Sequence, residues 1–589
     1  MVVKRFSQEG RQFIIQTDRV ICTTPVELIR SDMFRHVMAL YVRELKQHES
    51  PLVEALGIAG DPGAAVEFMT ELLSGLCARP LEELASSQPS WAHFTTPGAK
   101  NALHEFVEGL YDYWRRFYRF MVLRSEPGTE GHDRRPYRAF NEIMEGFTHL
   151  VRSTYRDLCE NIVGDHPRIY RQVAAGCNVG LIAVPKEPGL DSAYAGIVDG
   201  VPFIRQVLIA PPLIIDPPMN TRTGEFKRVD VNPLEGLSIN REEWLCYPAQ
   251  VGPLIIYVYF HQRFMGLGCA LSNLFELATD AHIGNGPDAM FMFGVPPEAM
   301  SCFGELPTVF YDDEETGMIT AAIPCEDRFG YFGYLKKMTL TLHNIIMMKR
   351  GRMPYHGAMV KIMLKGGMEA NLLIIGDTGT GKSESLEAFR TLGDARIREM
   401  RVVADDMGSL EITQEGRLVA YGTETGAFIR LDDLQKGYAF GQIDRAIIMS
   451  PQKVNARVVL PLTTIEEVLR GYPIDYLLYA NNYEEVDGAH PILERMDDME
   501  RALAVFREGA ALAKGTTTSK GLGHCYFANI FGPPQYRELH EPIALKTFDA
   551  AFGSGVWIGQ LRTRLGVPGC ETRGPEEAAR ALLDMMDGR

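Results

Sequence analysis

The glycine-rich segment at residues 376–383 constrains this 589-residue chain more than any other part of its sequence. It reads GDTGTGKS and fits the pattern G-x-x-x-x-G-K-[ST] of a phosphate-binding loop. The run NLLII before it favours a strand, and residues 383–392 favour a helix because they contain no proline or glycine. A strand that passes through such a loop into a helix predicts an α/β domain in this part of the chain.

The positions within this segment match what binding a phosphate requires. Glycines let backbone N–H groups converge on phosphate oxygens, and the following helix presents the positive end of its dipole. Lys382 can neutralise the β- and γ-phosphates, and the Ser383 hydroxyl can ligate Mg²⁺. We therefore expect ATP, another nucleoside triphosphate or pyrophosphate to bind here with Mg²⁺. The predicted binding residues are Gly376, Asp377, Thr378, Gly379, Thr380, Gly381, Lys382, Ser383 and Glu384.

An acidic pair follows the loop by about twenty residues. Asp405 and Asp406 end the apolar run MRVVA, at a predicted strand terminus. Carboxylates at such a position can hold the metal that bridges phosphates, or accept the proton of an attacking hydroxyl. Both residues are candidate catalytic groups.

Hydrophobic periodicity divides the chain into three predicted parts. Residues 1–165 are a helical extension, with apolar residues at three- and four-residue spacing in segments such as 102–123. Residues 166–335 are an α+β domain, and residues 336–589 are the P-loop domain. The predicted strands of the middle part lie at residues 179–184, 206–210, 254–259, 308–313 and 317–324.

An aromatic stripe in the helical extension could line a ligand groove, but a helix–helix core is the favoured interpretation. Its members are Phe106, Tyr111, Trp114, Phe117 and Phe120.

Composition excludes several classes of function. The chain has 60 Lys and Arg against 76 Asp and Glu, a net charge of −16, which argues against a nucleic-acid partner. Its longest apolar run, at residues 253–260, is far shorter than the roughly 20 residues that span a membrane. No signal-peptide core opens the sequence, and its ten cysteines form no C-x-x-C motif. We expect a cytoplasmic protein with reduced thiols and no membrane partner.

With these residues in hand, the chain resembles the phosphoenolpyruvate carboxykinases and the related HPr kinases. GDTGTGKSES, VADD and the dipeptide His356-Gly357 look especially like HPr kinase. The resemblance to the ATP-dependent carboxykinases is longer and covers about 260 residues, from 330 to 589. Its segments in order are YFGYLKK from Tyr331, His356, the P-loop, Asp405-Asp406, Glu424-Thr-Gly426, RGYPI from Arg470, the lid-like GAALAKGTTTSKG and CYFANIFG.

The resemblance implies a role for each matching residue. Lys336, His356 and Asp406 would ligate a catalytic divalent metal, typically Mn²⁺, and Ser383 the nucleotide's Mg²⁺. A lysine ligates a metal only when it is deprotonated, and a neutral imidazole suits a borderline metal. Arg470 would stabilise charge on the transferred phosphoryl group. Tyr331 would lie near the acceptor.

Departures from the family pattern concern the acceptor. The loop continues Lys-Ser-Glu where carboxykinases have Lys-Thr-Thr, and Arg430 stands where the family has a lysine. The best counterpart of the oxaloacetate-binding arginine is Arg222, in the segment MNTRTGEFKR. Residues 1–165 lie outside the resemblance.

Three functions remain open at this point. The first is a carboxykinase-like conversion of oxaloacetate and a phosphoryl donor to phosphoenolpyruvate and CO₂. The second is an HPr-kinase-like kinase that phosphorylates a hydroxyl of a small metabolite or a protein serine. The third is a non-catalytic nucleotide-binding regulator, and in each case the N-terminal helices offer a surface for a homo-oligomer. The sequence leaves the nucleotide base and the phosphoryl acceptor open.

Overall fold

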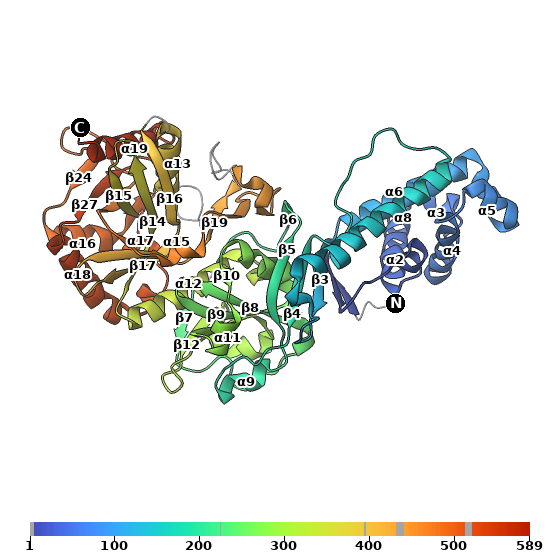
Figure 1. Cartoon of the computed structure of the whole chain (residues 1–589), viewed down its shortest axis with the longest axis horizontal. Coiled ribbons are helices and arrows are strands. Elements are labelled where there is room, and N and C mark those ends of the chain that lie inside the picture. Colours follow the sequence, from blue (N-terminus) through green and yellow to red (C-terminus); the bar gives the residue numbers. More distant parts are fainter. Residues whose placement is uncertain (1–4, 224, 394–395, 432–440, 513–520, 589) are drawn as a thin grey trace. The chain divides into compact units, whose positions relative to one another are not determined.

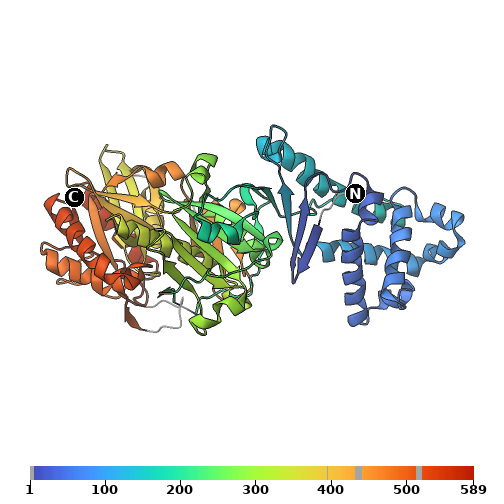
Figure 2. The ribbon, with the colours of Figure 1, turned by 90° about the horizontal axis from the view of Figure 1, so that it is seen from below.

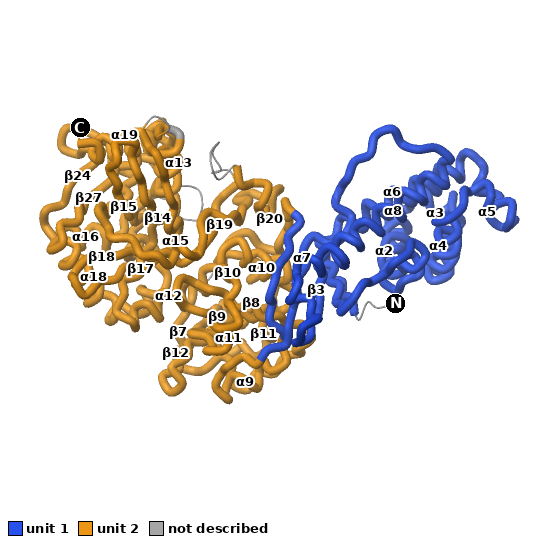
Figure 3. Tube along the Cα trace, viewed as in Figure 1, with its two compact units in different colours: residues 1–186, 202–210 blue, residues 187–201, 211–589 orange. Residues whose placement is uncertain are grey.

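The chain is a mixed α/β protein with large sheets of parallel and antiparallel strands. The computed structural model describes residues 5–223, 225–393, 396–431, 441–512 and 521–588. It divides into two compact units (Figure 3). Unit 1 holds residues 1–186 and 202–210, and unit 2 holds residues 187–201 and 211–589.

Unit 1 contains a sheet as well as helices. Its strands pair in the order β1-β2-β3-β4-β5, with parallel pairing of β2 with β3 and of β3 with β4, and antiparallel pairing of the outer pairs. Their bounds are β1 (Arg5–Glu9), β2 (Gln12–Thr17), β3 (Tyr118–Arg124), β4 (Val179–Val184) and β5 (Phe203–Ile209). The strands predicted at residues 179–184 and 206–210 are confirmed.

The helices of unit 1 pack against one another beside this sheet (Figures 1 and 2). They are α1 (Pro25–Ile29), α2 (Asp32–Gln47), α3 (Pro51–Ala55), α4 (Pro62–Leu76), α5 (Leu81–Ser87), α6 (Pro97–Arg115), α7 (Pro136–Ala139) and α8 (Gly146–Val163). The side chains of Ser31 and Asp61 cap α2 and α4 by accepting from the backbone N–H three residues later.

The aromatic stripe belongs mainly to the core. Phe106, Trp114, Phe117 and Phe120 are buried, which confirms the core interpretation for these four. Tyr111 is half-buried and lines a small apolar cavity of about 60 Å³ between α1, α2, α6 and α8.

The helix predicted over residues 102–123 is wrong in its second half. Helix α6 ends at Arg115, and Tyr118–Arg124 forms strand β3. Pairing on both edges explains the difference, because β3 lies between β2 and β4, each more than fifty residues away in sequence. Backbone pairing with distant segments here overrides a locally helical pattern.

Unit 2 contains a first sheet with the order β10-β8-β9-β11-β13-β12-β7. Its strands are β7 (Lys227–Val229), β8 (Trp244–Val251), β9 (Leu254–His261), β10 (Glu276–Leu277), β11 (Ala289–Val295), β12 (Val309–Asp312) and β13 (Ile319–Pro324). The strands predicted at residues 254–259, 308–313 and 317–324 are confirmed. A buried helix, α12 (Phe332–Lys349), follows this sheet in sequence.

A second sheet of unit 2 carries the glycine-rich segment. Its order is β22-β18-β17-β14-β15-β23-β27-β24, and β16 pairs with β14. The strands are β14 (Met353–Leu364), β15 (Glu369–Ile375), β16 (Ile397–Ala404), β17 (Met407–Ile412), β18 (Leu418–Gly422), β22 (Tyr472–Pro473), β23 (Tyr476–Asn481), β24 (Leu493–Arg495) and β27 (Trp557–Arg562). Helices α13 (Lys382–Gly393) and α19 (Arg573–Met586) lie side by side and share one apolar core with β14 and β15 (Figure 1).

Two smaller sheets also belong to unit 2, one with the order β19-β21-β20-β6 and one in which β25 (Ala510–Leu512) pairs with β26 (Leu522–His524). The strands of the first are β6 (Leu213–Ile215), β19 (Gly426–Arg430), β20 (Ile447–Met449) and β21 (Arg457–Pro461). The remaining α-helices above four residues are α9 (Ser192–Val198), α10 (Met265–Ala270), α11 (Asp280–Gly284), α15 (Ile465–Leu469), α16 (Met499–Glu508) and α18 (Arg537–Gly553).

The unit boundary differs from the domain boundaries expected at 165/166 and 335/336. Strands β4 and β5 belong to unit 1 because they continue its sheet from β3. Residues 211–335 group with the P-loop part rather than forming a unit of their own. Within the described residues, no helix is both long enough and apolar enough to cross a bilayer.

Candidate phosphate and metal site

The glycine-rich loop joins a strand to a helix as its sequence predicts. Strand β15 ends at Ile375, and α13 begins at Lys382. Gly381 has a φ of +90°, and a Cβ there would lie 2.7 Å from the Cβ of Thr563. The Thr563 hydroxyl donates to the carbonyl of Thr380 at 2.6 Å, which fixes the loop from its far side.

Lys382 folds back over the loop that precedes it. Its Nζ donates to the carbonyls of Gly376 at 2.6 Å and Asp377 at 2.8 Å. Burial lowers the pKa of Lys382, and the nearby carboxylates, Asp406 foremost, oppose that shift. The ammonium is therefore held where an anion in the loop would meet it.

Backbone hydrogen bonds place His356 between the loop and the acidic pair. Gly376 N donates to the His356 carbonyl at 3.1 Å, and Gly357 N donates to the Asp406 carbonyl at 2.9 Å. Gly357 has no room for a side chain, because a Cβ would lie 2.6 Å from the Ile374 carbonyl oxygen. Strand β14 thus holds the dipeptide His356-Gly357 next to the glycine-rich loop on one side and the acidic pair on the other.

Lys336 and His356 both contact the carboxylate of Asp406. The Nζ of Lys336, from α12, lies 2.6 Å from Asp406 Oδ2, and the Nε2 of His356 lies 3.0 Å from Asp406 Oδ1. Lys336 Nζ also lies 3.1 Å from Glu424 Oε1. The His356 ring is fixed on its other side by a 2.5 Å contact of Nδ1 with the Ala528 carbonyl, to which Nδ1–H donates.

The cluster shifts the pKa of each carboxyl in it. Burial opposes ionisation of Asp406, but Lys336 and His356 outweigh it and hold its pKa well below the usual range. Burial raises the pKa of Glu424 to about 7, with Lys336 acting against the shift. Burial opposes the charge of Lys336, yet Asp406 and Glu424 raise its pKa above the ordinary lysine value. Lys336 is therefore an ammonium ion between two carboxyls.

This donor set fits a divalent cation. Two nitrogens, from Lys336 and His356, converge on the carboxylate of Asp406. The positive charge of the Lys336 ammonium is compensated by the two acidic groups on either side of it, Asp406 and Glu424. A metal would take over that compensation, and Lys336 would ligate it after losing its proton.

Ser383 and Asp405 form a second polar pair beside this cluster. The Ser383 hydroxyl donates to Asp405 Oδ1 at 3.1 Å. Burial and the neighbouring Asp406 raise the pKa of Asp405 to about 6. A hydroxyl and a carboxylate at the start of the P-loop helix are suited to a hydrated Mg²⁺. A carboxyl with this pKa is also suited to act as a general base.

One cavity of about 190 Å³ connects these groups. Of the predicted binding residues, Thr378, Gly379, Lys382, Ser383 and Glu384 line it, whereas Gly376, Asp377, Thr380 and Gly381 shape the loop behind it. The predicted catalytic residues that line it are Lys336, His356, Lys382, Asp405 and Asp406.

Tyr331 lies at the cavity, and Arg222 lies near Phe531, one of the cavity's lining residues. Tyr331 lines the cavity and is almost fully buried. The Arg222 guanidinium lies 5.9 Å from the ring centroid of Phe531, and the Lys337 ammonium lies 4.6 Å from the same ring, which also lines the cavity. Burial, with Arg222 adding to it, lowers the pKa of Lys337 to about 8. Arg222 itself is not among the residues that line the cavity.

The structure does not bring Arg470 to the cavity. Arg470 directly follows α15, its side chain is half-exposed, and Nη2 pairs with Glu467 Oε1 at 2.9 Å, three residues back. Arg457 and Arg430 line the cavity instead, and Arg457 lies 5.4 Å from the ring centroid of Phe428. Arg457 and Arg430 thus lie where the resemblance led us to expect Arg470. The lid-like segment falls partly on residues 513–520, outside the described residues.

Sequence reasoning missed Glu424, Arg457 and Lys337 as site residues. Glu424 is buried, and sequence alone does not reveal which of the many carboxyl groups in an acidic chain is buried. Arg457 opens the apolar run of β21, and a cation at the start of a buried strand was the available signal. Lys337 adjoins Lys336 on α12, so the pair resembled a solvated charge patch.

Comparison with known proteins adds no assignment. No protein-family model matches this chain, and a search of curated proteins finds no match to its sequence.

Proposed function

We propose that this chain is a metal-dependent phosphotransferase of the phosphoenolpyruvate carboxykinase type. The fold proposed for it is the α/β P-loop domain of that family, preceded by an α+β domain. The observation that carries the proposal is the convergence of Lys336 and His356 on Asp406, beside the P-loop pair Ser383 and Asp405. Helices α12 and α13, strand β14 and the turn between β16 and β17 supply these groups, and one cavity connects them.

The residues divide into a donor half and an acceptor half. Lys382 and the loop N–H groups would bind the β- and γ-phosphates of ATP, another nucleoside triphosphate or pyrophosphate. Arg457 and Arg430 would balance charge on the transferred phosphoryl group. Tyr331, Lys337 and Arg222 would orient a small dicarboxylate such as oxaloacetate, because they gather positive charge and a hydroxyl at the other end.

The metal positions follow from the donor atoms. Lys336, His356 and Asp406 would hold Mn²⁺, and Ser383 with Asp405 would hold the Mg²⁺ of the nucleotide. Cations bound there supply Lewis-acid stabilisation of negative charge that develops on oxygen.

The proposed reaction balances without a further reactant. The bond between C3 of oxaloacetate and its C4 carboxylate breaks, CO₂ leaves, and the electron pair remains as the enolate of pyruvate. The enolate oxygen attacks the terminal phosphorus, and the bond to the bridging oxygen breaks toward the diphosphate. Lys337 and Arg222 would hold the remaining carboxylate in place, and the P-loop would hold the leaving diphosphate.

A donor and metal matrix tests this proposal. Purified full-length protein is incubated with oxaloacetate, Mn²⁺ and Mg²⁺, and with ATP, GTP or pyrophosphate in turn, and phosphoenolpyruvate is measured. We expect phosphoenolpyruvate with at least one donor. Its absence with all three donors, in protein that binds nucleotide, would exclude the carboxykinase reaction.

A hydroxyl kinase is the second candidate, and Asp405 favours it. With its pKa raised to about 6 and its contact with Ser383, Asp405 would serve as a general base beside donor phosphates bound in the loop. Phosphate transfer from labelled ATP to a small-molecule or protein serine hydroxyl, lost in Asp405→Asn with nucleotide binding retained, would support it. Nucleotide binding without turnover in either assay would support the third candidate, a non-catalytic regulator.

A further inference from the structure

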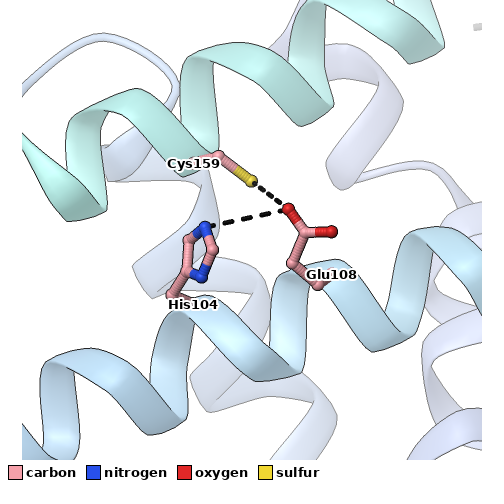
Figure 4. Close-up of side chains that lie close together, drawn as sticks. All are labelled: His104, Glu108 and Cys159. Atoms are coloured by element: carbon pink, nitrogen blue, oxygen red, sulfur yellow. Dashed lines mark hydrogen bonds and ion pairs between the residues drawn. The ribbon is translucent and has the colours of Figure 1, made fainter. Parts of the chain in front are cut away.

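Helices α6 and α8 of unit 1 bring three metal-ligand side chains together, in the unit that lacks the phosphotransfer site (Figure 4). His104 and Glu108 are four residues apart on α6 and so share one face of that helix, and Cys159 comes from α8. Glu108 Oε1 lies 3.7 Å from His104 Nε2 and 3.6 Å from Cys159 Sγ. One ligand atom from each residue lies within 4.8 Å of the other two.

These separations match the edges of a tetrahedral metal site. With zinc bonds of about 2.0 Å to nitrogen and oxygen and about 2.3 Å to sulfur, tetrahedral ligand atoms lie roughly 3.3 to 3.6 Å apart. The two measured distances from Glu108 Oε1 are within a few tenths of an ångström of that range. The third edge, between His104 and Cys159, is within 4.8 Å, so side-chain rotations that shorten it would close the three groups around one ion.

We propose that His104, Glu108 and Cys159 bind a divalent transition-metal ion of the zinc type, with a fourth coordination position left to water or a ligand. A nitrogen, an oxygen and a sulfur ligand together suit zinc and cobalt, whereas magnesium and calcium prefer oxygen ligands alone. One imidazole, one carboxylate and one thiolate balance the 2+ charge.

The surroundings of the three residues support a built site. The Tyr155 hydroxyl donates to Glu108 Oε1 at 2.6 Å and so orients the carboxylate from outside. Cys159 is buried, whereas the side chains of His104 and Glu108 are 37% and 44% exposed. An ion can therefore reach the group from solvent while its sulfur ligand is shielded from oxidation.

A purely structural interpretation uses the same contacts. Without a metal, the Cys159 thiol and the Tyr155 hydroxyl both donate to Glu108 Oε1, and the cluster is a polar link between α6 and α8. That interpretation predicts no thiolate at the site, so a probe that responds only to a metal–thiolate bond separates the two.

Cobalt(II) provides this probe. Full-length protein is titrated with Co²⁺, and the near-ultraviolet charge-transfer absorption of a cobalt–thiolate bond is measured. We expect the band to saturate at one equivalent, to disappear when Zn²⁺ is added, and to be absent in Cys159→Ser. His104→Gln, at a partly exposed position that leaves the fold intact, is expected to weaken binding at least about tenfold, and Tyr155→Phe about tenfold.

Cys325→Ser is the matched control. Cys325 Sγ lies 3.6 Å from His261 Nδ1, so this is a second place where a thiol meets an imidazole, and we expect the band to be unchanged there. The phosphotransfer cavity has no cysteine among its lining residues and contributes no such band. The proposal is overturned by a wild-type protein without the band, by a band that survives in Cys159→Ser, or by one that is lost in Cys325→Ser.

Discussion

Arg119 of unit 1 and Lys336 of unit 2 are both buried cations, but they have different partners. In unit 1 the buried Arg119 guanidinium donates to three backbone carbonyls, those of Gly176 at 2.6 Å, Trp114 at 3.0 Å and Phe117 at 3.1 Å. In unit 2 the buried Lys336 meets two carboxyl side chains, Asp406 and Glu424.

The difference distinguishes a charge with a structural role, that of Arg119, from a charge in the candidate site, that of Lys336. Burial lowers the pKa of Arg119 to about 10, so it stays charged at neutral pH and its partners cannot titrate. The carboxyl groups around Lys336 titrate and shift one another, with the pKa of Glu424 raised to about 7 and that of Asp406 lowered. The carbonyls around Arg119 hold that charge in place in the fold, whereas the carboxylates around Lys336 can exchange the ammonium for another cation.

Asp406→Asn should have the largest effect on activity. The change leaves Lys336 and His356 without their shared anion and removes a proposed metal ligand, so we expect phosphotransfer by the folded protein to fall about 10³-fold or more. Initial rates of phosphoenolpyruvate formation measure it, and nucleotide binding should persist. Glu415→Gln, on an exposed turn of the same unit, is the control and should retain full activity. More than a tenth of the activity left in Asp406→Asn would contradict the assignment.

Arg457→Ala should reduce turnover about 10²-fold, because Arg457 lines the cavity and has no competing carboxylate among its described partners. Arg470→Ala is its counterpart outside the cavity. We expect a change there of less than about twofold, since a half-exposed pair with Glu467 contributes little. Steady-state kcat for the two variants decides between the arginines, and a larger loss in Arg470→Ala would reverse the assignment.

Arg119→Leu should lower stability and leave turnover unchanged, in contrast to the cavity variants of unit 2, which lower turnover. Three carbonyls lose their donor, and we expect about 2–3 kcal/mol of lost stability with unchanged turnover in folded protein. Urea unfolding followed by tryptophan fluorescence measures it, because the guanidinium lies 5.4 Å from the Trp114 ring centroid. Arg116→Leu, at an exposed pair with Glu44, should change stability by less than about 0.5 kcal/mol. An equal loss of stability in Arg119→Leu and Arg116→Leu would show that the buried guanidinium has no special structural role.

His343 provides the smallest effect and sharpens the comparison within unit 2. Burial lowers its pKa to about 4, below the value of about 6.5 in an unfolded chain. Between these values the unfolded chain takes up a proton that the folded chain does not, so stability falls as pH falls from 6.5 toward 4. The contribution is at most about 1.4 kcal/mol per pH unit. Unfolding at pH 7 and 5 should show a shallower loss in His343→Phe than in wild type, and an equal slope would show that His343 does not contribute.

Local sequence predicted the parts of the site that local structure determines. The loop at residues 376–383, its strand and its helix follow from one motif, and the pair at residues 405–406 follows from the end of an apolar run. Arg457 and Arg470 could not be distinguished in the same way, because they are only thirteen positions apart and each precedes an apolar stretch that contains proline. Only the pairing of β21 with β19 and β20 distinguishes which arginine lies beside Phe428.

Strand β3 of the unit 1 sheet was beyond local reasoning for a related reason. Strand β3 looks helical by periodicity, and its true state depends on β2 and β4, which no short window contains. The boundary of the unit was missed together with the strand, since β4 and β5 belong to unit 1 only once β3 is known to be their neighbour.

The path of the chain through the two units limits how they can be exchanged by recombination. Residues 1–186 build unit 1, residues 187–201 belong to unit 2, and residues 202–210 return to complete the sheet of unit 1. A gene fusion or recombination joint at residue 165 would leave β4 and β5 without β1, β2 and β3, and would expose the edge of β4 to other chains. One crossover there therefore cannot exchange the two units between proteins as separate cassettes, because it would divide the sheet of unit 1.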